Sequence, residues 1–484
     1  MKLGEILQDI KAEVFNVNVN DVINQIVFNS KKVNSGDVFI CLRGVNTDGH
    51  EYCNEALKRG ALAVIVDHKL DEEIPQIVVD DTRQVFSLIS ANFFQNVHKK
   101  LKLIGITGTN GKTTTTMIIR DILIASGKKV GVIGTLGYFI QEQNFECDLT
   151  TPDPMKLHGI FFEMYNKGVE YVIMEVSAHA IALDKIYGLT FEVGALTNIT
   201  QDHLDFFETM DNYIKTKFKF MQSTQIKSKF LNADDESVHF LEDEMSFTYG
   251  IYQPSDCFAM DISLEMGKSK YLLNLFDNII EVETKLSGEF NVYNVLLGSS
   301  ICCMLGVDVN TIKSVICKIE PVTGRYNVIS TNNGCIVIDF AHTPDGLENI
   351  LKSIRQNCKK LICVFGCGGN RDSKKRPIMG SVVEKYATSA IITSDNPRFE
   401  NPDLIAEDIL EGIVDKTKFT VENDRTNAIK MAISKLDNDT VIAICGKGGE
   451  KYQDINGIMY PYDDNNIVMT ILADLNIQTN NKFE

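Results

Sequence analysis

The chain has 484 residues, of which 44% are hydrophobic and 23% are charged, as in ordinary globular proteins. Its length predicts about three domains. Its net charge of −17 argues against a general nucleic-acid surface, and its apolar runs are too short to cross a membrane. The N-terminus lacks a signal core, and the 12 cysteines lack metal-binding spacing. We therefore expect a cytoplasmic protein with reduced thiols, without nucleic-acid partners or membrane insertion.

The first hundred residues alternate short strands and helices, which predicts a small α/β binding domain. A turn at residues 34–37 precedes an apolar run at 38–42, and a polar loop then leads into a helix. Ser30 and residues 46–50 offer hydrogen-bonding groups, although single residues of these kinds more often serve only to build turns. The domain should end at the polar segment near residue 98.

Residues 102–127, KLIGITGTNGKTTTTMIIRDILIASG, predict a strand, a glycine-rich loop and a helix. Gly108 and Gly111 would let backbone N–H groups approach phosphate oxygens, Lys112 would face the outer phosphates, and the Thr113 hydroxyl would bind Mg²⁺. The glycines follow GxxGxxGKT rather than GxxxxGK[ST], which departs from ordinary GTPases. The flanking strand and helix disfavour the alternative of a turn with a chance Gly-Lys pair.

Two further apolar strands, at 171–174 and 193–196, deliver Glu175 and the segment containing His203 to strand ends. Ligands in open α/β sheets collect at the carboxyl ends of the strands. A single Glu or His at such a place is more often solvated or merely structural. Their joint placement beside the phosphate loop favours a site in which Thr113, Glu175 and His203 hold Mg²⁺ against ATP.

Other polar groups of the central region allow more than one interpretation. The prolines of TTPDP, residues 150–154, would hold its threonines in an exposed loop. The three lysines of the helix at 210–221 are explained most simply by a solvated basic face. Asn291 and Asn294 open an apolar helix, which they could cap, or they could present amides to a base.

From residue 328 onward strands and helices alternate again. Four strands are each followed by a polar loop, with the sequences DFAHTPD, GCGGNRD, DNPR and GKGGE. Four such loops imply a doubly wound, Rossmann-like domain with one functional edge.

Taken in order, GITGTNGKTTT, MEVSAHA, TNITQDHLD, FNVYN, DFAHTPD, GCGGNRD, DNPR and GKGGE resemble the Mur ligase family over nearly the whole chain. Any one could arise by chance, but the ordered set is specific. The resemblance implies an α/β fold with three domains: a small UDP-binding domain (1–98), a central P-loop mononucleotide-binding ATPase domain (99–327) and a Rossmann-like amino-acid-binding domain (328–484).

The resemblance also implies site residues. ATP would be held by Gly108, Thr109, Asn110, Gly111, Lys112, Thr113, Thr114, Asn291, Asn294, Arg325, His342 and Asp345. The UDP-muramoyl dipeptide would contact Ser30, Asn46, Thr47, Asp48, His50, Thr150, Thr151, Ser177 and Lys185. Lys217 matches the lysine that the family carbamylates, so that Thr113, Glu175, His203 and the Lys217 carbamate would bind Mg²⁺, and Lys112, Glu175, His203 and Lys217 would be catalytic. The neighbouring Lys215 and Lys219 leave that assignment open.

DNPR, residues 395–398, is similar to the signature of family members that add meso-diaminopimelate, whereas lysine-adding relatives lack its arginine. Arg398 could grip the extra carboxylate of diaminopimelate through a bidentate pair. Arg371, Asp395, Asn396, Pro397, Gly446 and Glu450 would complete the pocket. On its own, DNPR would be an ordinary strand-to-helix turn.

The implied activity is ATP-dependent ligation of meso-diaminopimelate to the D-glutamyl γ-carboxylate of UDP-N-acetylmuramoyl-L-alanyl-D-glutamate. The reaction would run through an acyl phosphate, in peptidoglycan precursor synthesis, and we expect a monomer. The alternatives are a lysine-adding ligase, folylpolyglutamate synthase, or a non-catalytic nucleotide or UDP-sugar sensor. DNPR and the full N-terminal domain disfavour the first two, and the intact catalytic set disfavours the sensor. Three positions depart from the family pattern: Lys31 and Lys185 replace arginine, and Gly449 replaces the histidine of GKGHE.

Overall fold

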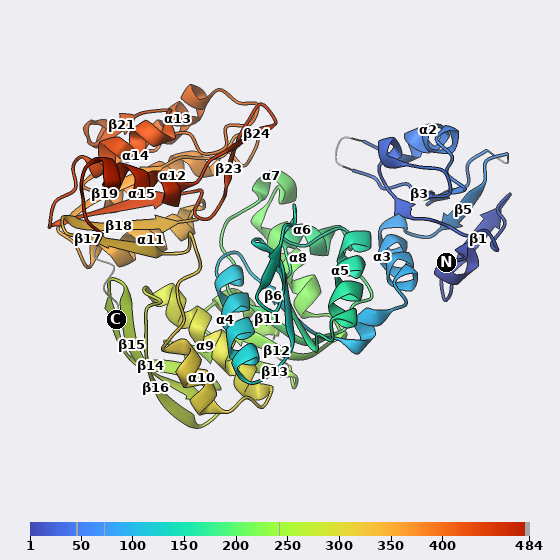
Figure 1. Cartoon of the computed structure of the whole chain (residues 1–484), viewed down its shortest axis with the longest axis horizontal. Coiled ribbons are helices and arrows are strands. Elements are labelled where there is room, and N and C mark those ends of the chain that lie inside the picture. Colours follow the sequence, from blue (N-terminus) through green and yellow to red (C-terminus); the bar gives the residue numbers. More distant parts are fainter. Residues whose placement is uncertain (45–46, 72, 242, 480–484) are drawn as a thin grey trace.

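The structure, a computed structural model, describes residues 1–44, 47–71, 73–241 and 243–479. Three α/β domains follow one another along the chain, each built around its own main sheet (Figure 1). In this view the N-terminal and C-terminal domains lie on either side of the central one. Among the described helices, none combines the length and apolar character needed to cross a bilayer.

The N-terminal domain contains a five-stranded sheet in the order β1-β5-β4-β3-β2, in which only β1 is antiparallel to its neighbour. Its strands are β1 (Ala12–Phe15), β2 (Ile26–Val27), β3 (Val38–Ile40), β4 (Ala63–Val66) and β5 (Gln76–Val79). Its helices are α1 (Leu3–Ile6), α2 (Cys53–Lys58) and α3 (Thr82–Phe93), with short 3₁₀ turns η1 (Ser30–Lys32), η2 (Gly49–Tyr52) and η3 (Val97–Lys100).

The central domain has an eleven-stranded sheet in the order β16-β15-β14-β13-β12-β11-β6-β10-β7-β8-β9. The strands are β6 (Lys102–Thr107), β7 (Val130–Gly134), β8 (Gly137–Ile140), β9 (Gln143–Phe145), β10 (Tyr171–Glu175), β11 (Phe191–Leu196), β12 (Ile226–Asn232), β13 (Ser246–Gly250), β14 (Cys257–Glu265), β15 (Lys268–Leu275) and β16 (Asn278–Thr284). The helices are α4 (Lys112–Ala125), α5 (Pro154–Asn166), α6 (Ala178–Ala182), α7 (Leu204–Phe207), α8 (Met210–Met221), η4 (Glu236–Leu241), α9 (Glu289–Met304) and α10 (Val309–Ile316).

Three parallel strands at the middle of this sheet bring the candidate residues together. β6 pairs with β10 on one side and with β11 on the other, so Thr107, Glu175 and Leu196 end at one edge of the sheet. The predicted strands are confirmed with shifts of one or two residues, and Glu175 is the last residue of β10 rather than the first after it. Because parallel strands end together, a phosphate loop after β6 must lie beside the residues that follow β10 and β11.

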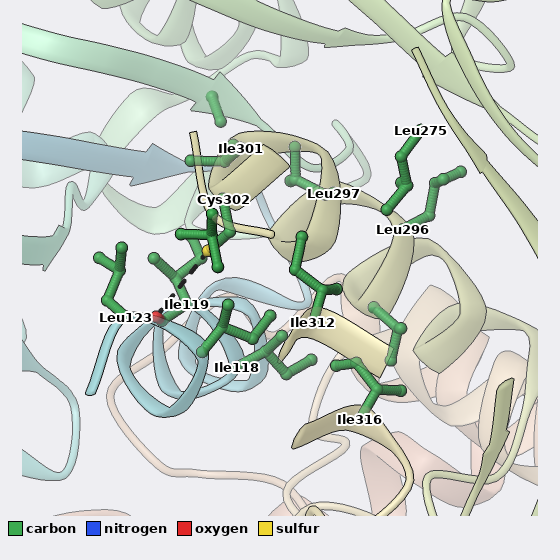
Figure 2. Packing of buried hydrophobic residues seen from close by; sticks show 14 of the residues in the cluster. Ile118, Ile119, Leu123, Leu275, Leu296, Leu297, Ile301, Cys302, Ile312 and Ile316 are labelled. Carbon is green, nitrogen blue, oxygen red and sulfur yellow. Dashed lines mark hydrogen bonds between the residues drawn. The ribbon is translucent and has the colours of Figure 1, made fainter. Parts of the chain in front are cut away.

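The helix that follows the phosphate loop packs against an apolar core. Figure 2 shows Ile118, Ile119 and Leu123 of α4 facing Leu297 and Ile301 of α9. Gly298 permits this approach, since a Cβ there would lie 2.7 Å from a side-chain carbon of Ile118. Helices α5 and α8 cover the opposite face of the sheet through a second apolar cluster. The base of the phosphate loop is therefore fixed by close packing.

The C-terminal domain repeats the architecture with a six-stranded sheet in the order β17-β18-β22-β19-β20-β21, antiparallel only between β17 and β18. Its strands are β17 (Asn327–Thr331), β18 (Gly334–Asp339), β19 (Lys360–Phe365), β20 (Ser389–Ile392), β21 (Phe419–Val421) and β22 (Thr440–Cys445), followed by the hairpin β23 (Tyr452–Ile455) and β24 (Ile458–Pro461). Its helices are α11 (Pro344–Arg355), α12 (Lys375–Tyr386), α13 (Pro402–Glu411), η5 (Lys416–Lys418), α14 (Arg425–Ile433) and α15 (Asp464–Asp474). The four predicted polar loops follow β18, β19, β20 and β22.

Candidate active site

The loop between β6 and α4 has the backbone shape of a phosphate cradle. Gly108 has φ +138° and Gly111 has φ +85°, and an added Cβ would lie 1.8 Å from Thr197 Oγ1 at the first position and 2.3 Å from Asn294 Oδ1 at the second. Lys112 Nζ donates to the carbonyl oxygens of Gly108 at 2.9 Å and Thr109 at 2.8 Å. Glycine is thus required at both positions for conformation and for space.

Glu175 is buried next to the start of α4 and accepts three hydrogen bonds. Its Oε1 accepts from the Thr113 hydroxyl and from the Thr135 backbone N–H, each at 2.9 Å, and its Oε2 accepts from the Thr135 hydroxyl at 3.1 Å. A hydroxyl and a carboxylate held together in this way are oxygen ligands of the kind that Mg²⁺ prefers.

A group of histidines and Asp202 lies beside this pair. Burial lowers the pKa of His203 to about 3, which leaves its ring neutral near pH 7, and its Nε2 lies 3.3 Å from Asp202 Oδ2. The rings of His179 and His203 meet edge to face with centroids 4.8 Å apart. Burial opposes ionisation of Asp202, but the positive charge of Lys375 and the His203 backbone N–H, which donates to Asp202 Oδ1 at 2.9 Å, favour the carboxylate and lower its pKa. A neutral imidazole next to a stable carboxylate is suited to hold a cation.

Lys217 differs sharply from the two other lysines on α8. Its side chain is buried, with Nζ 4.6 Å from the centre of the Tyr213 ring, whereas Lys215 and Lys219 are exposed and Lys219 pairs with Asp184 at 2.8 Å. Burial lowers the pKa of Lys217 well below its ordinary value, and the charge of Lys112 lowers it further. Desolvation therefore favours the uncharged amine, which is the nucleophilic form.

The C-terminal domain closes over the phosphate loop through polar contacts. Asn110 Nδ2 donates to Asp345 Oδ2 at 2.9 Å, Lys375 Nζ lies 3.9 Å from Asp202 Oδ1, and Arg371 Nη1 lies 3.8 Å from Asp205 Oδ2. These pairs join the start of α11, the start of α12 and the loop after β19 to the loop after β6 and to the segment that follows β11.

Arg325 and the GKGGE loop meet at the junction between the two domains. Arg325 stacks on Phe340, with the guanidinium carbon 4.1 Å from the ring centre, and its Nη2 lies 3.5 Å from Thr113 Oγ1. A Cβ at Gly449 would lie 2.8 Å from the Thr323 carbonyl oxygen. A histidine in place of Gly449 would therefore require this backbone to shift, which gives a local reason for the departure from GKGHE.

Asn291 and Asn294 do not cap α9, so that alternative is wrong. The N-cap residue is Gly288, without a side-chain hydrogen bond. Asn291 Nδ2 donates to the Ser287 carbonyl at 2.8 Å, and Asn294 Nδ2 donates to Asn291 Oδ1 at 3.1 Å. Both side chains line the cleft described below.

The candidate dipeptide residues form a second group beside Glu175. Thr151 Oγ1 donates to the Glu175 carbonyl at 2.7 Å and accepts from the Ser177 backbone N–H at 3.1 Å. Thr150 and Thr135 hydroxyls lie 3.1 Å apart. Lys185, which replaces an expected arginine, pairs with Asp153 at 2.8 Å.

The candidate diaminopimelate residues meet at the loops after β19, β20 and β22. Arg398 has φ +52°, and its Nη1 donates to the Gly369 carbonyl at 2.8 Å while its Nε lies 3.6 Å from Asp454 Oδ2. Asn396 Nδ2 donates to Glu450 Oε2 at 2.9 Å.

A Cβ at Gly446 would lie 2.4 Å from Asp395 Oδ2, and one at Gly369 would lie 2.0 Å from the Pro397 carbonyl oxygen. The glycines let these loops pack directly on DNPR.

The candidate uridine residues lie in the N-terminal domain, away from the other groups. The Ser30 hydroxyl donates to Glu55 Oε2 at 3.1 Å. His50 Nδ1 lies 2.5 Å from Asp48 Oδ1. Thr47 is exposed. Asn46, the remaining member of this loop, lies outside the described residues.

One cleft of about 2160 Å³ joins most of the central candidates. From the predicted set it is lined by Thr109, Asn110, Gly111, Lys112, Thr113, Thr114, Thr150, Glu175, Ser177, His203, Asn291, Asn294, Arg325, His342, Asp345, Arg371 and Glu450. The predicted residues outside its lining are Gly108, Thr151, Lys185, Lys217, Gly446, DNPR and the uridine residues. Arg398 is nevertheless close to it, since a Cβ at Gly368 would lie 2.9 Å from Arg398 Nη1 and 3.7 Å from Arg371 Cγ.

Several lining or supporting residues were not singled out from the sequence. Asn198 accepts from the Asn110 backbone N–H at 2.9 Å, Thr135 holds Glu175, and Lys375 faces Asp202. Asn198 and Thr135 follow β11 and β7 at the same sheet edge, so the strand-end rule could have found them. Lys375 carried no such signal, because only the docking of the two domains brings it near.

Each of the three domains matches a known family model. Family models described as Mur ligase family catalytic domain, Mur ligase middle domain and Mur ligase glutamate ligase domain match residues 22–99, 106–302 and 324–448. The UDP-N-acetylmuramoyl-L-alanyl-D-glutamate–2,6-diaminopimelate ligase 1 of Clostridium acetobutylicum is 39% identical, covering 98% of this chain and 100% of the relative. The corresponding ligase of Aquifex aeolicus is also 39% identical, over 93% and 94% of the two chains.

A solved structure of a UDP-N-acetylmuramoyl-L-alanyl-D-glutamate–2,6-diaminopimelate ligase is similar over 98% of this chain and 99% of its own, with a TM-score of 0.69 and 28% identity. This similarity spans all three domains. The chain belongs to the Mur ligase family.

Proposed function

We propose that this chain is an ATP-dependent ligase that joins meso-diaminopimelate to the D-glutamyl γ-carboxylate of UDP-N-acetylmuramoyl-L-alanyl-D-glutamate. The observation that carries the proposal is the cleft that the phosphate loop shares with the C-terminal strand-end loops. This shared cleft supports an ATP-type anion site on the central domain and an amino-acid site on the facing C-terminal domain. The names of the full-length relatives support the choice of substrates.

The phosphate end of the reaction belongs to the central domain. Backbone N–H groups of residues 108–113 would cradle the ATP phosphates, and Lys112 would balance charge on the transferred phosphoryl group. The γ-carboxylate of the dipeptide, held near Ser177 and Lys185, would attack the γ-phosphorus, displacing ADP and giving an acyl phosphate. The amine of diaminopimelate would then attack the acyl carbon, and phosphate would leave.

A divalent cation fits the oxygen-rich pair formed by Thr113 and Glu175, whose Oγ1 and Oε1 atoms lie 2.9 Å apart. These two residues, with His203 and a Lys217 carbamate, would hold Mg²⁺ there. When bound, the ion would neutralise charge on the phosphate oxygens. The buried, uncharged amine of Lys217 supports carbamylation, because a carbamate forms from the free amine and CO₂.

Selection of the amino acid would rest on Arg398. Its guanidinium is within reach of Asp454 and the Gly369 carbonyl, which orient it next to the cleft residue Arg371. Two arginines near one pocket suit an amino acid with two carboxylates. L-lysine has one carboxylate fewer and would leave one arginine without a substrate carboxylate.

The test is phosphate release by the purified full chain with Mg²⁺, ATP and UDP-N-acetylmuramoyl-L-alanyl-D-glutamate. We expect release that depends on meso-diaminopimelate, together with a nucleotide product heavier by one diaminopimelate residue. Lys112→Met is the matched inactive control. Preference for L-lysine would overturn the pocket assignment. Absence of phosphate release with both amino acids would favour a non-catalytic sensor.

A further inference from the structure

Two buried cysteines of the N-terminal domain have their sulfur atoms in direct contact. Cys41 follows β3 and Cys53 begins α2, and their Sγ atoms are 3.2 Å apart. Cys41 is 0% exposed and Cys53 is 3% exposed. A disulfide requires the sulfurs to approach to about 2.05 Å, so the two sulfurs would have to move closer by roughly 1 Å.

The segment between the two cysteines contains the candidate uridine loop. Its described parts run back on each other: Arg43 bridges Asp48, the Gly44 N–H donates to the Thr47 carbonyl at 2.8 Å, and the Gly49 N–H donates to the Leu42 carbonyl at 3.0 Å. The thiols therefore stand at the two ends of one folded loop. Any bond between them would fix both ends at once.

We propose that Cys41 and Cys53 form an oxidisable dithiol, which hydroperoxides convert to a disulfide that fastens the loop at residues 42–52. The effect on substrate binding rests on the proposed function, which assigns the uridine end of the substrate to this loop. The formation of the bond itself does not depend on that assignment.

The hydrogen bond between the thiols gives them different roles. It lowers the pKa of Cys53, and together with burial it raises the pKa of Cys41. The Cys53 thiolate attacks one oxygen of hydrogen peroxide, the O–O bond breaks, and Cys53 becomes a sulfenic acid while the other oxygen leaves as water. Cys41 sulfur then attacks Cys53 sulfur, the S–OH bond breaks, and a second water leaves. Two thiols and one peroxide thus yield one disulfide and two waters.

Cys363 provides a matched control for this pair. It is also 0% exposed, but it lies within β19 at the centre of the C-terminal sheet, where β20 and β22 flank it. A serine there removes a buried thiol of the same type without touching the loop at 42–52. Cys363→Ser should therefore leave oxidation at Cys41 and Cys53 unchanged.

The experiment treats the reduced full chain with one equivalent of hydrogen peroxide, blocks remaining thiols with N-ethylmaleimide and maps tryptic peptides without reduction. We expect a peptide pair joined through Cys41 and Cys53 in the wild type and in Cys363→Ser, and its absence in Cys53→Ser. Because the wild-type map requires no variant, misfolding of Cys53→Ser would not weaken the result. Sulfinic acid at either cysteine without the joined pair would overturn the proposal.

Binding of UDP-N-acetylmuramoyl-L-alanyl-D-glutamate, measured by calorimetry, tests the consequence. We expect oxidation to weaken binding at least threefold and a reductant to restore it, because the bond displaces both ends of a closely packed loop. Unchanged affinity in the joined protein would overturn the link to binding. If the bond forms but neither state binds the nucleotide substrate, the proposed function fails while the dithiol stands.

Discussion

Lys217 is the buried member of three lysines on α8, and its environment separates it from its neighbours. Replacing it with alanine removes the only amine among the three that burial keeps uncharged in the described structure. We expect phosphate release at saturating substrates to fall about 100-fold or more, the usual loss when one group that stabilises transition-state charge is removed. Lys215→Ala, at an exposed position of the same helix, should keep wild-type activity.

Carbamylation itself is measurable without turnover. Wild-type protein equilibrated with ¹³C-bicarbonate should show a carbamate carbon signal by NMR, and Lys217→Ala should lack it. A signal that survives in this variant would assign the modification to another amine. Loss of activity in Lys215→Ala instead would reverse the choice between the two lysines.

Arg398 allows a test of amino-acid selection that holds the backbone constant. Its φ is +52°, so alanine and lysine at this position bear the same conformational strain as arginine. We expect Arg398→Ala to raise the KM for meso-diaminopimelate about 10- to 100-fold, since a hydrogen bond to a charged group contributes about 1.5–3 kcal/mol.

The KM values for ATP and for the UDP-linked dipeptide serve as internal controls in that experiment. They should change less than twofold, and Arg398→Lys should lie between alanine and arginine because it keeps the charge but loses the bidentate geometry. A similar rise in all three KM values would mean that the substitution disturbs the domain rather than the pocket.

At the scale of the element, helix α4 has a left-handed glycine at each end, and only one of them touches the site. Gly111 has φ +85° with Asn294 Oδ1 only 2.3 Å from an added Cβ, whereas Gly127 has φ +82° with nothing within 4 Å. Alanine at either position should cost about 1–2 kcal/mol of stability through backbone strain. Gly111→Ala should in addition displace Asn294 and weaken ADP binding at least tenfold.

Calorimetric titration with ADP and thermal melting separate these two effects. Gly127→Ala should melt at a lower temperature than the wild type but bind ADP with unchanged affinity. Equal loss of ADP affinity in both variants would show that strain at either end of α4 weakens ADP binding. The contact of residue 111 with Asn294 would then make no separate contribution to ADP affinity.

At the scale of the molecule, the junction between the N-terminal and central domains carries a pair of buried histidines. His98 of η3 and His158 of α5 meet edge to face at 5.0 Å, and α3 packs against α5 beside them. Burial lowers the pKa of His98 to about 4, so the folded junction keeps this ring neutral.

A lowered folded-state pKa makes the junction sensitive to acid. The unfolded chain takes up a proton at its ordinary pKa of 6.5, while the folded chain does so only near pH 4. His98 therefore contributes stability in full above pH 6.5, and that contribution is lost as the pH falls to 4, at up to about 1.4 kcal/mol per pH unit. As the pH falls over this range, the urea concentration at the midpoint of the first unfolding transition should fall less in His98→Phe than in the wild type.

Urea unfolding at pH 8, where both imidazoles are neutral, gives the packing cost of that substitution as a baseline. The difference between wild type and variant should shift in favour of the variant as the pH is lowered from 6.5 to 4. Parallel curves over this range would show that His98 does not contribute to the acid sensitivity of the chain.

Much of the site could be predicted from the sequence because its chemistry is local in the chain. The glycines, lysine and threonine of residues 108–113 form their loop through short-range backbone requirements. Glu175 could be placed because it ends an apolar run, and parallel strands end at a common edge. The α/β fold and the order of the strand-end loops after residue 328 followed from the same alternation of apolar runs and turns.

What the sequence alone determined, then, was the set of strand-end groups and their order, because each depends on neighbours along the chain. Tertiary structure decided which lysine of α8 is buried, that Asn291 and Asn294 face a cleft rather than cap a helix, and that Lys375 approaches Asp202. It also brought Cys41 and Cys53 together across a loop. These outcomes depend on the packing of elements distant in sequence, and burial and proximity of that kind leave no periodic pattern in the chain.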